Sequence, residues 1–165
     1  MHRGLDDKVW AEYEAVYAQS WKPAEVSPEF LRDFARAESA AGRLRLGIAR
    51  EDGRAIAAQL WTVEGSTAFI HKLAHLGEAS ARSPGTLLSA ALFAHVIDTD
   101  KVDLVDFGTG DQSYKADWMD CRRERVGLLA FDQRHWRGWL AASRHILHRY
   151  GQRLKQIVSA VVSRR

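Results

Sequence analysis

Residues 83–110 read SPGTLLSAALFAHVIDTDKVDLVDFGTG, and their pattern sets the topology expected of the sheet. Pro84 suits the first position of a helix, and the apolar residues after it predict a helix that ends near Asp100. Residues 102–107 form a short strand that ends in Gly108-Thr109-Gly110. With a strand before the helix, this stretch makes one right-handed crossover within a sheet.

Three strands are expected before the crossover. Leu44, Leu46 and Ile48 alternate with polar or small residues, and extended runs follow at 55–63 and 67–75. The turns between them are too short to hold a helix, so the three strands form an antiparallel meander. We therefore predict a mixed α/β sheet, antiparallel at its start and followed by a β-α-β crossover, with helices on both faces.

The outer segments are mostly helical. Residues 5–20 carry an apolar stripe at helical spacing, and Ser27-Pro28 begins a second helix that reaches Gly42. Residues 125–131 read as a last strand. From Trp136 a seam recurs at steps of three and four, through Trp139, Ser143, Ile146, Tyr150, Leu154, Ile157 and Val161.

One domain is expected, residues 1–165, with a helical segment 1–42, a core 43–131 and a long basic helix 134–162. The single cysteine, Cys121, excludes a disulfide framework and a multi-cysteine metal site. No apolar run approaches the roughly 20 residues that cross a bilayer. These features indicate a cytoplasmic protein.

The charge of the chain is uneven. Its net charge is +3, but residues 133–165 hold eight Lys or Arg and no acidic residue. Such a segment is typical of a nucleic-acid or membrane contact, or of a solvated helix face.

Three stretches carry candidate chemistry. The first is the loop Arg82-Ser83-Pro84-Gly85-Thr86, where free amides at a helix start attract anions and glycine permits close approach. The alternative is a loop without a ligand.

The second stretch runs from Asp106 to Trp118 and gathers two carboxylates, Tyr114, Lys115 and an indole beyond the end of a strand. Ligand sites of α/β sheets lie at such strand ends. A glycine turn capped by Asp106, with Trp118 in the core, is the structural alternative.

The third stretch is the strand 69–75. Strict alternation puts His71 and His75 on one face and Lys72 on the other. Two histidines without a third ligand nearby do not make a metal site, so none is expected. Lys72 is either an edge residue with a solvated ammonium or a site cation.

Taken together, these motifs resemble the GNAT acyltransferase superfamily, in the branch similar to FemAB aminoacyltransferases and CelD-type proteins of polysaccharide biosynthesis. The resemblance rests on Ser83-Pro84-Gly85-Thr86, on Asp106-Phe107-Gly108, and on Tyr114-Lys115 followed by Trp118. It covers roughly residues 5–131. The loop Arg82-x-x-Gly85-x-Leu87 matches two of the three fixed positions of the superfamily pattern Gln/Arg-x-x-Gly-x-Gly/Ala.

The resemblance implies that the chain binds acetyl-CoA or another acyl-CoA without a metal and transfers the acyl group directly. Tyr114 is then the catalytic acid, and Asp106 orients or deprotonates the acceptor. The expected CoA-binding residues are Leu73, His75, Arg82, Ser83, Pro84, Gly85 and Thr86. The expected acceptor-binding residues are Gln59, Trp61, Lys72 and Lys115.

The expected acceptor is an amine or hydroxyl of a small molecule or sugar, in particular a cell-envelope polysaccharide precursor. The alternatives are a non-catalytic binding or scaffold domain and an aminoacyltransferase that uses aminoacyl-tRNA. The C-terminal helix is expected to mediate a homodimer, to cover a partner domain, or to lie on the inner membrane, with nucleic acid the less favoured partner.

Overall fold

The computed structural model describes residues 1–162, with side chains as far as residue 151. The chain divides into two compact units, Met1–Trp118 and Met119–Arg165.

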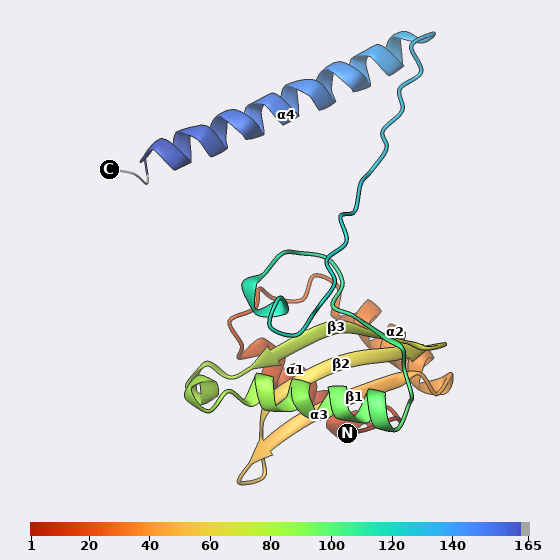
Figure 1. Ribbon diagram of the computed structural model, residues 1–165, viewed down its shortest axis with the longest axis vertical. Helices are drawn as coiled ribbons and strands as arrows, with labels where there is room; N and C mark the ends of the chain where they lie inside the picture. Colours follow the sequence, from red (N-terminus) through yellow and green to blue (C-terminus); the bar gives the residue numbers. More distant parts are fainter. Residues whose placement is uncertain (163–165) are drawn as a thin grey trace. The chain divides into compact units, whose positions relative to one another are not determined.

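The first unit is built on a four-stranded sheet in the order β1-β2-β3-β4 (Figure 1). The strands are β1 (Leu44–Glu51), β2 (Arg54–Glu64), β3 (Thr67–His75) and β4 (Leu104–Asp106). The first three pair antiparallel, whereas β4 pairs parallel to β3 after the helix α3 (Pro84–Asp98). The mixed α/β fold, with its meander and crossover, is confirmed.

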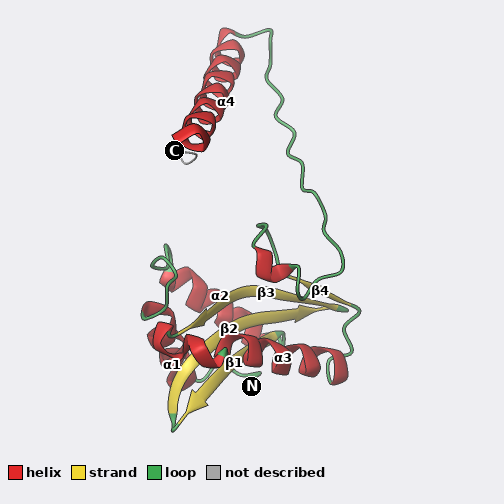
Figure 2. Cartoon of the chain, turned by 60° about the vertical axis from the view of Figure 1, so that its left-hand side comes forward, coloured by secondary structure: helices red, strands yellow, loops and turns green. Residues whose placement is uncertain are grey.

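Helices cover both faces of this sheet (Figure 2). α1 (Asp7–Ala18) and α2 (Pro28–Ala40) bury one face through residues such as Trp10, Tyr13 and Leu31. α3 buries the other face, packing its Leu88, Leu92 and Val96 against Trp61 and Ile70. Full burial of a large apolar side chain stabilises the fold by about 1.5 to 3 kcal/mol, so the two clusters fix the sheet between its helices.

A bulge in β3 overturns one expectation from the sequence. Leu60 pairs with Lys72 and Trp61 pairs with Ile70, so His71 is an extra residue on this strand. An extra residue reverses the alternation of faces beyond it. His71 therefore packs against Phe34 of α2, with ring centroids 5.1 Å apart, while the ring of His75 lies beside Gly85 at the start of α3. The two histidines do not share a face.

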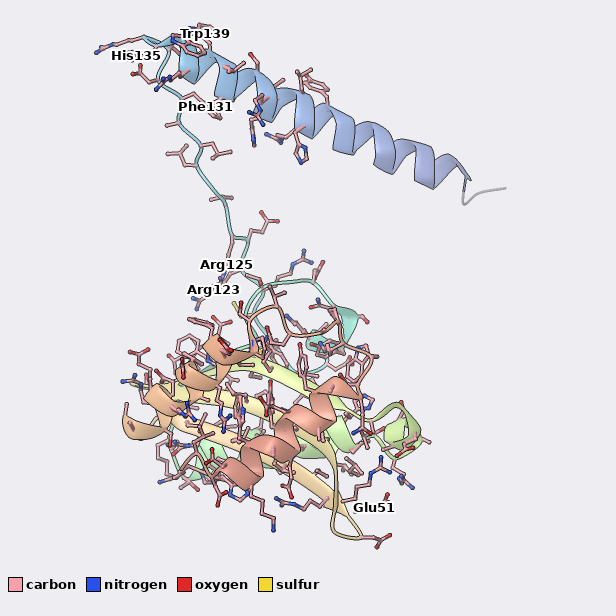
Figure 3. All side chains as sticks on the ribbon, turned by 180° about the vertical axis from the view of Figure 1, so that it is seen from behind. Glu51, Arg123, Arg125, Phe131, His135 and Trp139 are labelled. Carbon is pink, nitrogen blue, oxygen red and sulfur yellow. The ribbon has the colours of Figure 1, made fainter. Side chains whose placement is uncertain are left out.

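The strand expected at residues 125–131 is wrong. Residues 121–132 form neither helix nor strand (Figure 3). Val126 and Leu128 are more than 90% exposed. Alternating apolar residues suit a pleated surface, but a strand also needs a neighbour to pair with. This segment pairs with none among the residues that the structure describes.

The second unit holds the long helix α4 (Trp136–Val162). Asp132 accepts hydrogen bonds from the Arg134 amide and from His135, in the turn that leads into the helix. Three residues of the expected seam, Leu154, Ile157 and Val161, lie in the part of α4 whose side chains the structure does not describe. Within the described residues, no helix is long and apolar enough to cross a membrane.

Candidate active site

The start of α3 is open to a ligand. Ser83 has a left-handed backbone (φ 50°), Pro84 opens the helix, and no side chain caps it within the described residues. The first turn also lacks an acidic residue. Unpaired amides and the positive end of the helix dipole therefore favour an anion here. A Cβ on Gly85 would stand 3.1 Å from the His75 ring, so glycine keeps this approach clear.

A cavity of about 520 Å³, here called the α3 cavity, opens beside this helix start. It is lined by the loop after α1, by β3, by the short helix η1 (Gly77–Arg82), by the first turns of α3 and by the segment that follows β4. The lining residues are Trp21, Leu73, His75, Ser80, Ser83, Gly85, Thr86, Ser89, Phe107, Tyr114, Asp117 and Trp118. Trp118 is held by stacking on Phe93 of α3 at 4.9 Å. The cavity thus combines an apolar wall with the open amides of α3.

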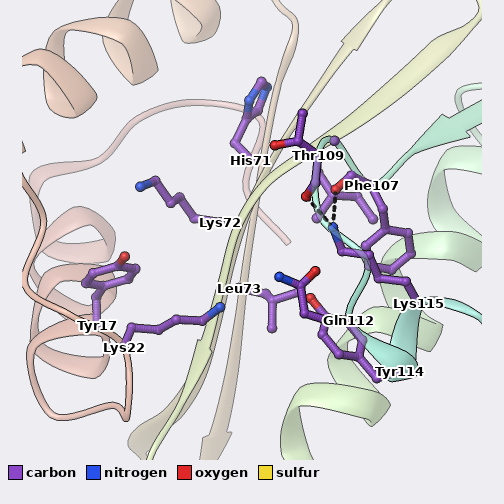
Figure 4. A pocket seen from close by; sticks show the side chains of 12 residues that line it. Tyr17, Lys22, His71, Lys72, Leu73, Phe107, Thr109, Gln112, Tyr114 and Lys115 are labelled. Carbon is purple, nitrogen blue, oxygen red and sulfur yellow. Dashed lines mark hydrogen bonds between the residues drawn. The ribbon is translucent and has the colours of Figure 1, made fainter. Parts of the chain in front are cut away.

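A second cavity of about 400 Å³, here called the lysine cavity, also has Leu73 in its lining (Figure 4). It is lined by Tyr17, Lys22, Ile70, His71, Lys72, Leu73, Phe107, Gly108, Thr109, Gln112, Tyr114 and Lys115. Its three lysines come from three separate segments: the loop after α1, strand β3, and the short helix η2 (Ser113–Lys115).

Tyr114 stands where the two cavities meet, since Tyr114, Leu73 and Phe107 line both of them. Partial burial raises the pKa of Tyr114 above its usual value of 10.0. The phenol therefore stays protonated at neutral pH and is able to donate its proton to a group in either cavity.

The loop after β4 is braced by Lys115 and Asp106. The Lys115 ammonium donates hydrogen bonds to the carbonyls of Phe107 (3.1 Å) and Thr109 (2.7 Å). Asp106 Oδ1 accepts one from the Gly108 amide at 2.6 Å. Asp106 lines neither cavity, so the structure favours the turn-capping role for it over the role of a base.

Gln59 and Trp61 do not line the acceptor side, contrary to expectation. Both are fully buried beneath α3. Gln59 Nε2 donates to the Gly85 carbonyl (2.9 Å) and to Ser89 Oγ (2.8 Å), and Gln59 Oε1 accepts from the Trp61 indole (2.9 Å). Gln59 and Trp61 therefore affect the cavities only through α3, because their hydrogen bonds hold the first turns of this helix in place.

The other expected CoA-binding residues separate into two groups. Leu73, His75, Ser83, Gly85 and Thr86 come together on the α3 cavity. Arg82 instead forms a surface ion pair with Glu51 at 2.8 Å, and Pro84 is buried in the first turn of α3. Neither of these two lines a cavity.

Trp21 lines the α3 cavity and Lys22 lines the lysine cavity, and neither was predicted from the sequence. Ser20 forms an antiparallel bridge to Leu76 at the end of β3, and this bridge brings the loop after α1 to the site. Trp21 then packs on His75, with ring centroids 4.3 Å apart. Because Ser20 and Leu76 are 56 positions apart, their bridge leaves no signal in the local sequence pattern.

His71 lines the lysine cavity at the bulge. Its Nε2 is 2.8 Å from Thr62 Oγ1. Partial burial of the ring and the nearby charge of Lys72 lower the pKa of His71 below 6.5, although Glu38 acts in the opposite direction. The imidazole is therefore neutral at pH 7. No cluster of three or more potential metal ligands occurs among the described residues.

Residues 4–116 match the family model described as acetyltransferase (GNAT) domain. Comparison with curated proteins finds no match. Among solved structures, 33 chains match. At 14–15% sequence identity, the three structures described next show a shared fold and no more.

Three of these structures are named as acetyltransferases, and one of them contains a CoA-linked ligand. An aminoglycoside 6'-N-acetyltransferase from Acinetobacter baumannii is 15% identical with a TM-score of 0.53, over 78% of this chain and 95% of that one. Glucosamine-6-phosphate N-acetyltransferase from Arabidopsis thaliana is 14% identical with a TM-score of 0.56, over 76% and 95%. AAC(6')-Iy, in complex with a bisubstrate analogue containing CoA, is 15% identical with a TM-score of 0.56, over 76% and 93%.

Proposed function

The chain belongs to the acetyltransferase (GNAT) domain family, and on that basis we propose that it transfers an acyl group, acetyl in the first instance, directly from acyl-CoA to an amine or hydroxyl. The sequence motifs further favour the FemAB-like and CelD-like branch of the superfamily. The whole of the proposed site lies in the first unit, Met1–Trp118.

The observation that carries this proposal is the position of Tyr114 between two cavities. Direct transfer needs a donor and an acceptor bound side by side, with a proton donor at the point where they meet. The α3 cavity suits the donor because the uncapped amides of Gly85 and Thr86 at the start of α3 favour an anionic group such as the pyrophosphate of CoA. The lysine cavity is then left for the acceptor.

The chemistry follows from this arrangement. The acceptor nitrogen or oxygen attacks the thioester carbon, a new C–N or C–O bond forms, and the C–S bond breaks. The departing thiolate takes the Tyr114 proton, and the phenolate is later reprotonated from water. Since Asp106 lines neither cavity, the proton lost by the acceptor leaves through solvent in the open lysine cavity.

Calorimetry with acetyl-CoA tests the donor site. We expect micromolar binding that Gly85→Asp weakens by at least about tenfold, because a carboxylate then repels the pyrophosphate from the α3 amides. Gly4→Asp is the matched control, since Gly4 has open space around it and lines neither cavity. If no acyl-CoA gives any heat with the native chain, a non-catalytic binding domain replaces the enzyme.

Thiol release by Tyr114→Phe tests the acid. We expect turnover to fall about 100-fold while the affinity for acetyl-CoA stays unchanged, because the phenyl ring keeps the wall but loses the proton. Tyr150→Phe, on the exposed surface of α4, serves as the control. Equal turnover of Tyr114→Phe and the native chain at all pH values would remove Tyr114 from the mechanism.

An amino sugar is the acceptor class to assay first. Two of the matched structures are an aminoglycoside 6'-N-acetyltransferase and a glucosamine-6-phosphate N-acetyltransferase. A cell-envelope polysaccharide precursor is the specific acceptor we propose. The aminoacyl-tRNA alternative predicts tight, salt-dependent RNA binding by the basic C-terminal segment, so the absence of an RNA gel shift at low salt counts against it.

For the second unit we propose peripheral contact of α4 with an anionic membrane. At about 100° per residue, its exposed apolar side chains lie within an arc of about 120°. They are Trp136, Trp139, Leu140, Ile146, Leu147 and Tyr150. Arg137 and Arg144 lie on one flank of this arc and Arg149 on the other, and residues 133–165 contain no acid.

The charges distinguish a membrane from a second copy of the helix. Helices that pair through such a seam usually match Lys or Arg at its flanks with Glu or Asp on the partner, and α4 has no acidic residue to offer. A surface of anionic lipid supplies that charge.

Co-sedimentation with vesicles tests the α4 proposal. We expect binding to phosphatidylglycerol vesicles, little binding to phosphatidylcholine vesicles, and loss of binding in a Trp136→Ser, Trp139→Ser double variant. A concentration-dependent dimer with no vesicle binding would assign the seam to a second copy instead.

A further inference from the structure

The lysine cavity carries an excess of positive charge. Lys22, Lys72 and Lys115 line it, and no Asp or Glu is among its lining residues in the described chain. The three ammonium groups are brought together by the chain topology, since they come from the loop after α1, from β3 and from η2. Such convergence of like charges is unfavourable unless a ligand or a protein group compensates for it.

Protein groups compensate for only part of this charge. Lys72 forms an ion pair with the half-buried Glu25 at 2.5 Å and lies over the Tyr17 ring. Lys115 is held by two neutral carbonyls, which leave its charge in place and one of its three N–H groups unused. Lys22 lies over the Trp21 ring, 5.3 Å from its centroid, and no hydrogen-bond acceptor for its ammonium is found among the described residues.

The electrostatics of Lys22 agree with this account. Burial lowers the pKa of Lys22 below its usual 10.5, and the positive charges of Lys115 and Lys72 lower it further. An anion placed between these ammonium groups would offset their mutual repulsion and raise the pKa of Lys22 again. The neighbouring Thr109 hydroxyl and Gln112 amide, which line the same cavity, are further donors for oxygen atoms of such an anion.

We propose that the acceptor carries a phosphate monoester, which binds between Lys22 and Lys115 in the lysine cavity. With Lys72 neutralised by Glu25, two positive charges remain. A phosphate monoester carries about −1.5 to −2 at pH 7 and matches them, whereas a carboxylate leaves one uncompensated. The inference rests on the proposed function, because the anion anchors the acceptor next to Tyr114.

Calorimetry with inorganic phosphate tests the proposal on the full chain saturated with CoA. The bound CoA keeps its own phosphate groups on the α3 amides, so that added phosphate reports on the lysine cavity. We expect phosphate to bind, to bind about tenfold more weakly to Lys22→Met, and not to bind to Lys22→Glu. Lys8→Met is the matched control, since Lys8 is exposed on α1 and lines neither cavity.

The outcomes separate this inference from the proposed function. Equal phosphate affinity in the native chain, Lys22→Met and Lys8→Met overturns the inference while CoA binding stands. Acetate that binds as tightly as phosphate also overturns it, because a carboxylate then suffices. Failure of CoA itself to bind overturns the proposed function. Lys22 lies in a surface loop, and equal melting temperatures of the variants confirm that each one folds.

Discussion

Arg45 and Asp100 form the best-buried ion pair of the first unit, and it ties β1 to the end of α3. Two hydrogen bonds of 2.8 Å join the guanidinium to the carboxylate, and the two side chains are only 7% and 5% exposed. Removing one partner leaves a buried charge without compensation. We expect Asp100→Ala to lower the free energy of unfolding by about 3 to 5 kcal/mol, measured by urea denaturation.

The control for this prediction is Asp33→Ala. Asp33 pairs with Arg36 on the surface of α2, where both side chains are more than half exposed. Its loss is expected to cost no more than about 0.5 kcal/mol. Equal losses for Asp100→Ala and Asp33→Ala would show that the buried pair is not a main support of the fold.

The same pair predicts how stability depends on pH. The hydrogen bond from Arg45 lowers the pKa of Asp100 below 3.8, although burial acts in the opposite direction. The unfolded chain therefore takes up this proton at a higher pH than the folded chain does. The contribution of Asp100 is full above the unfolded pKa and is lost as the pH falls through the folded pKa.

We expect the free energy of unfolding to drop as the pH is lowered from about 5 to about 2, and to drop less in Asp100→Ala. Urea denaturation at several pH values measures both slopes. Identical slopes for the two proteins would contradict the assignment to Asp100.

Single residues also show what the sequence could predict of the site. The sequence motifs were enough to select four residues that line the α3 cavity, namely Ser83, Gly85, Thr86 and Tyr114, because each lies in a short local motif. Lys22 was not predictable, since its loop reaches β3 only through contacts between residues far apart in the sequence, such as the bridge from Ser20 to Leu76.

At the scale of elements, α3 depends on Gly47 of β1. A Cβ at this position would stand 2.9 Å from Leu92 Cδ1 and 3.1 Å from Leu88 Cδ1, both in the core beneath α3. A side chain there has to push the helix away from the sheet or distort its leucines. We expect Gly47→Ala to lower the free energy of unfolding by about 1 to 3 kcal/mol, measured by urea denaturation.

Gly77→Ala is the control for Gly47→Ala. Gly77 has no atom within 4 Å of an added Cβ and no positive φ, so its substitution should be nearly neutral. If Gly47→Ala proves as neutral as Gly77→Ala, the contact between β1 and α3 is looser than the packing indicates.

Elements with a strong local pattern were predicted well, and those that depend on a neighbour were not. The meander and α3 follow from alternation and helical spacing within each segment. The bulge at His71 does not, because it appears only when β3 is aligned with β2. Residues 125–131 have the residue types of a strand but form no β-pairing with any strand that the structure describes.

At the scale of the whole molecule, the two units differ in what holds them together. The first unit contains both apolar clusters and both cavities. The second unit begins at Met119, and its residues 121–132 form an exposed segment without helix or strand. Exposed segments of this kind are where proteases cut first, because the backbone enters the protease without unfolding the core.

We therefore expect trypsin to cut first at Arg122, Arg123 or Arg125, which follow directly after the first unit (Figure 3). The N-terminal fragment keeps the packed sheet and the lining of both cavities, so it should bind acetyl-CoA within about twofold of the intact chain's affinity. Mass spectrometry of the early digest locates the cut, and calorimetry on the purified fragment measures binding.

Arg45, buried in β1, is the internal control and should resist cleavage until the fragment unfolds. A first cut before Trp118 would contradict the prediction that residues 121–132 are the most accessible segment. A fragment that folds but no longer binds acetyl-CoA would contradict the assignment of the whole site to the first unit.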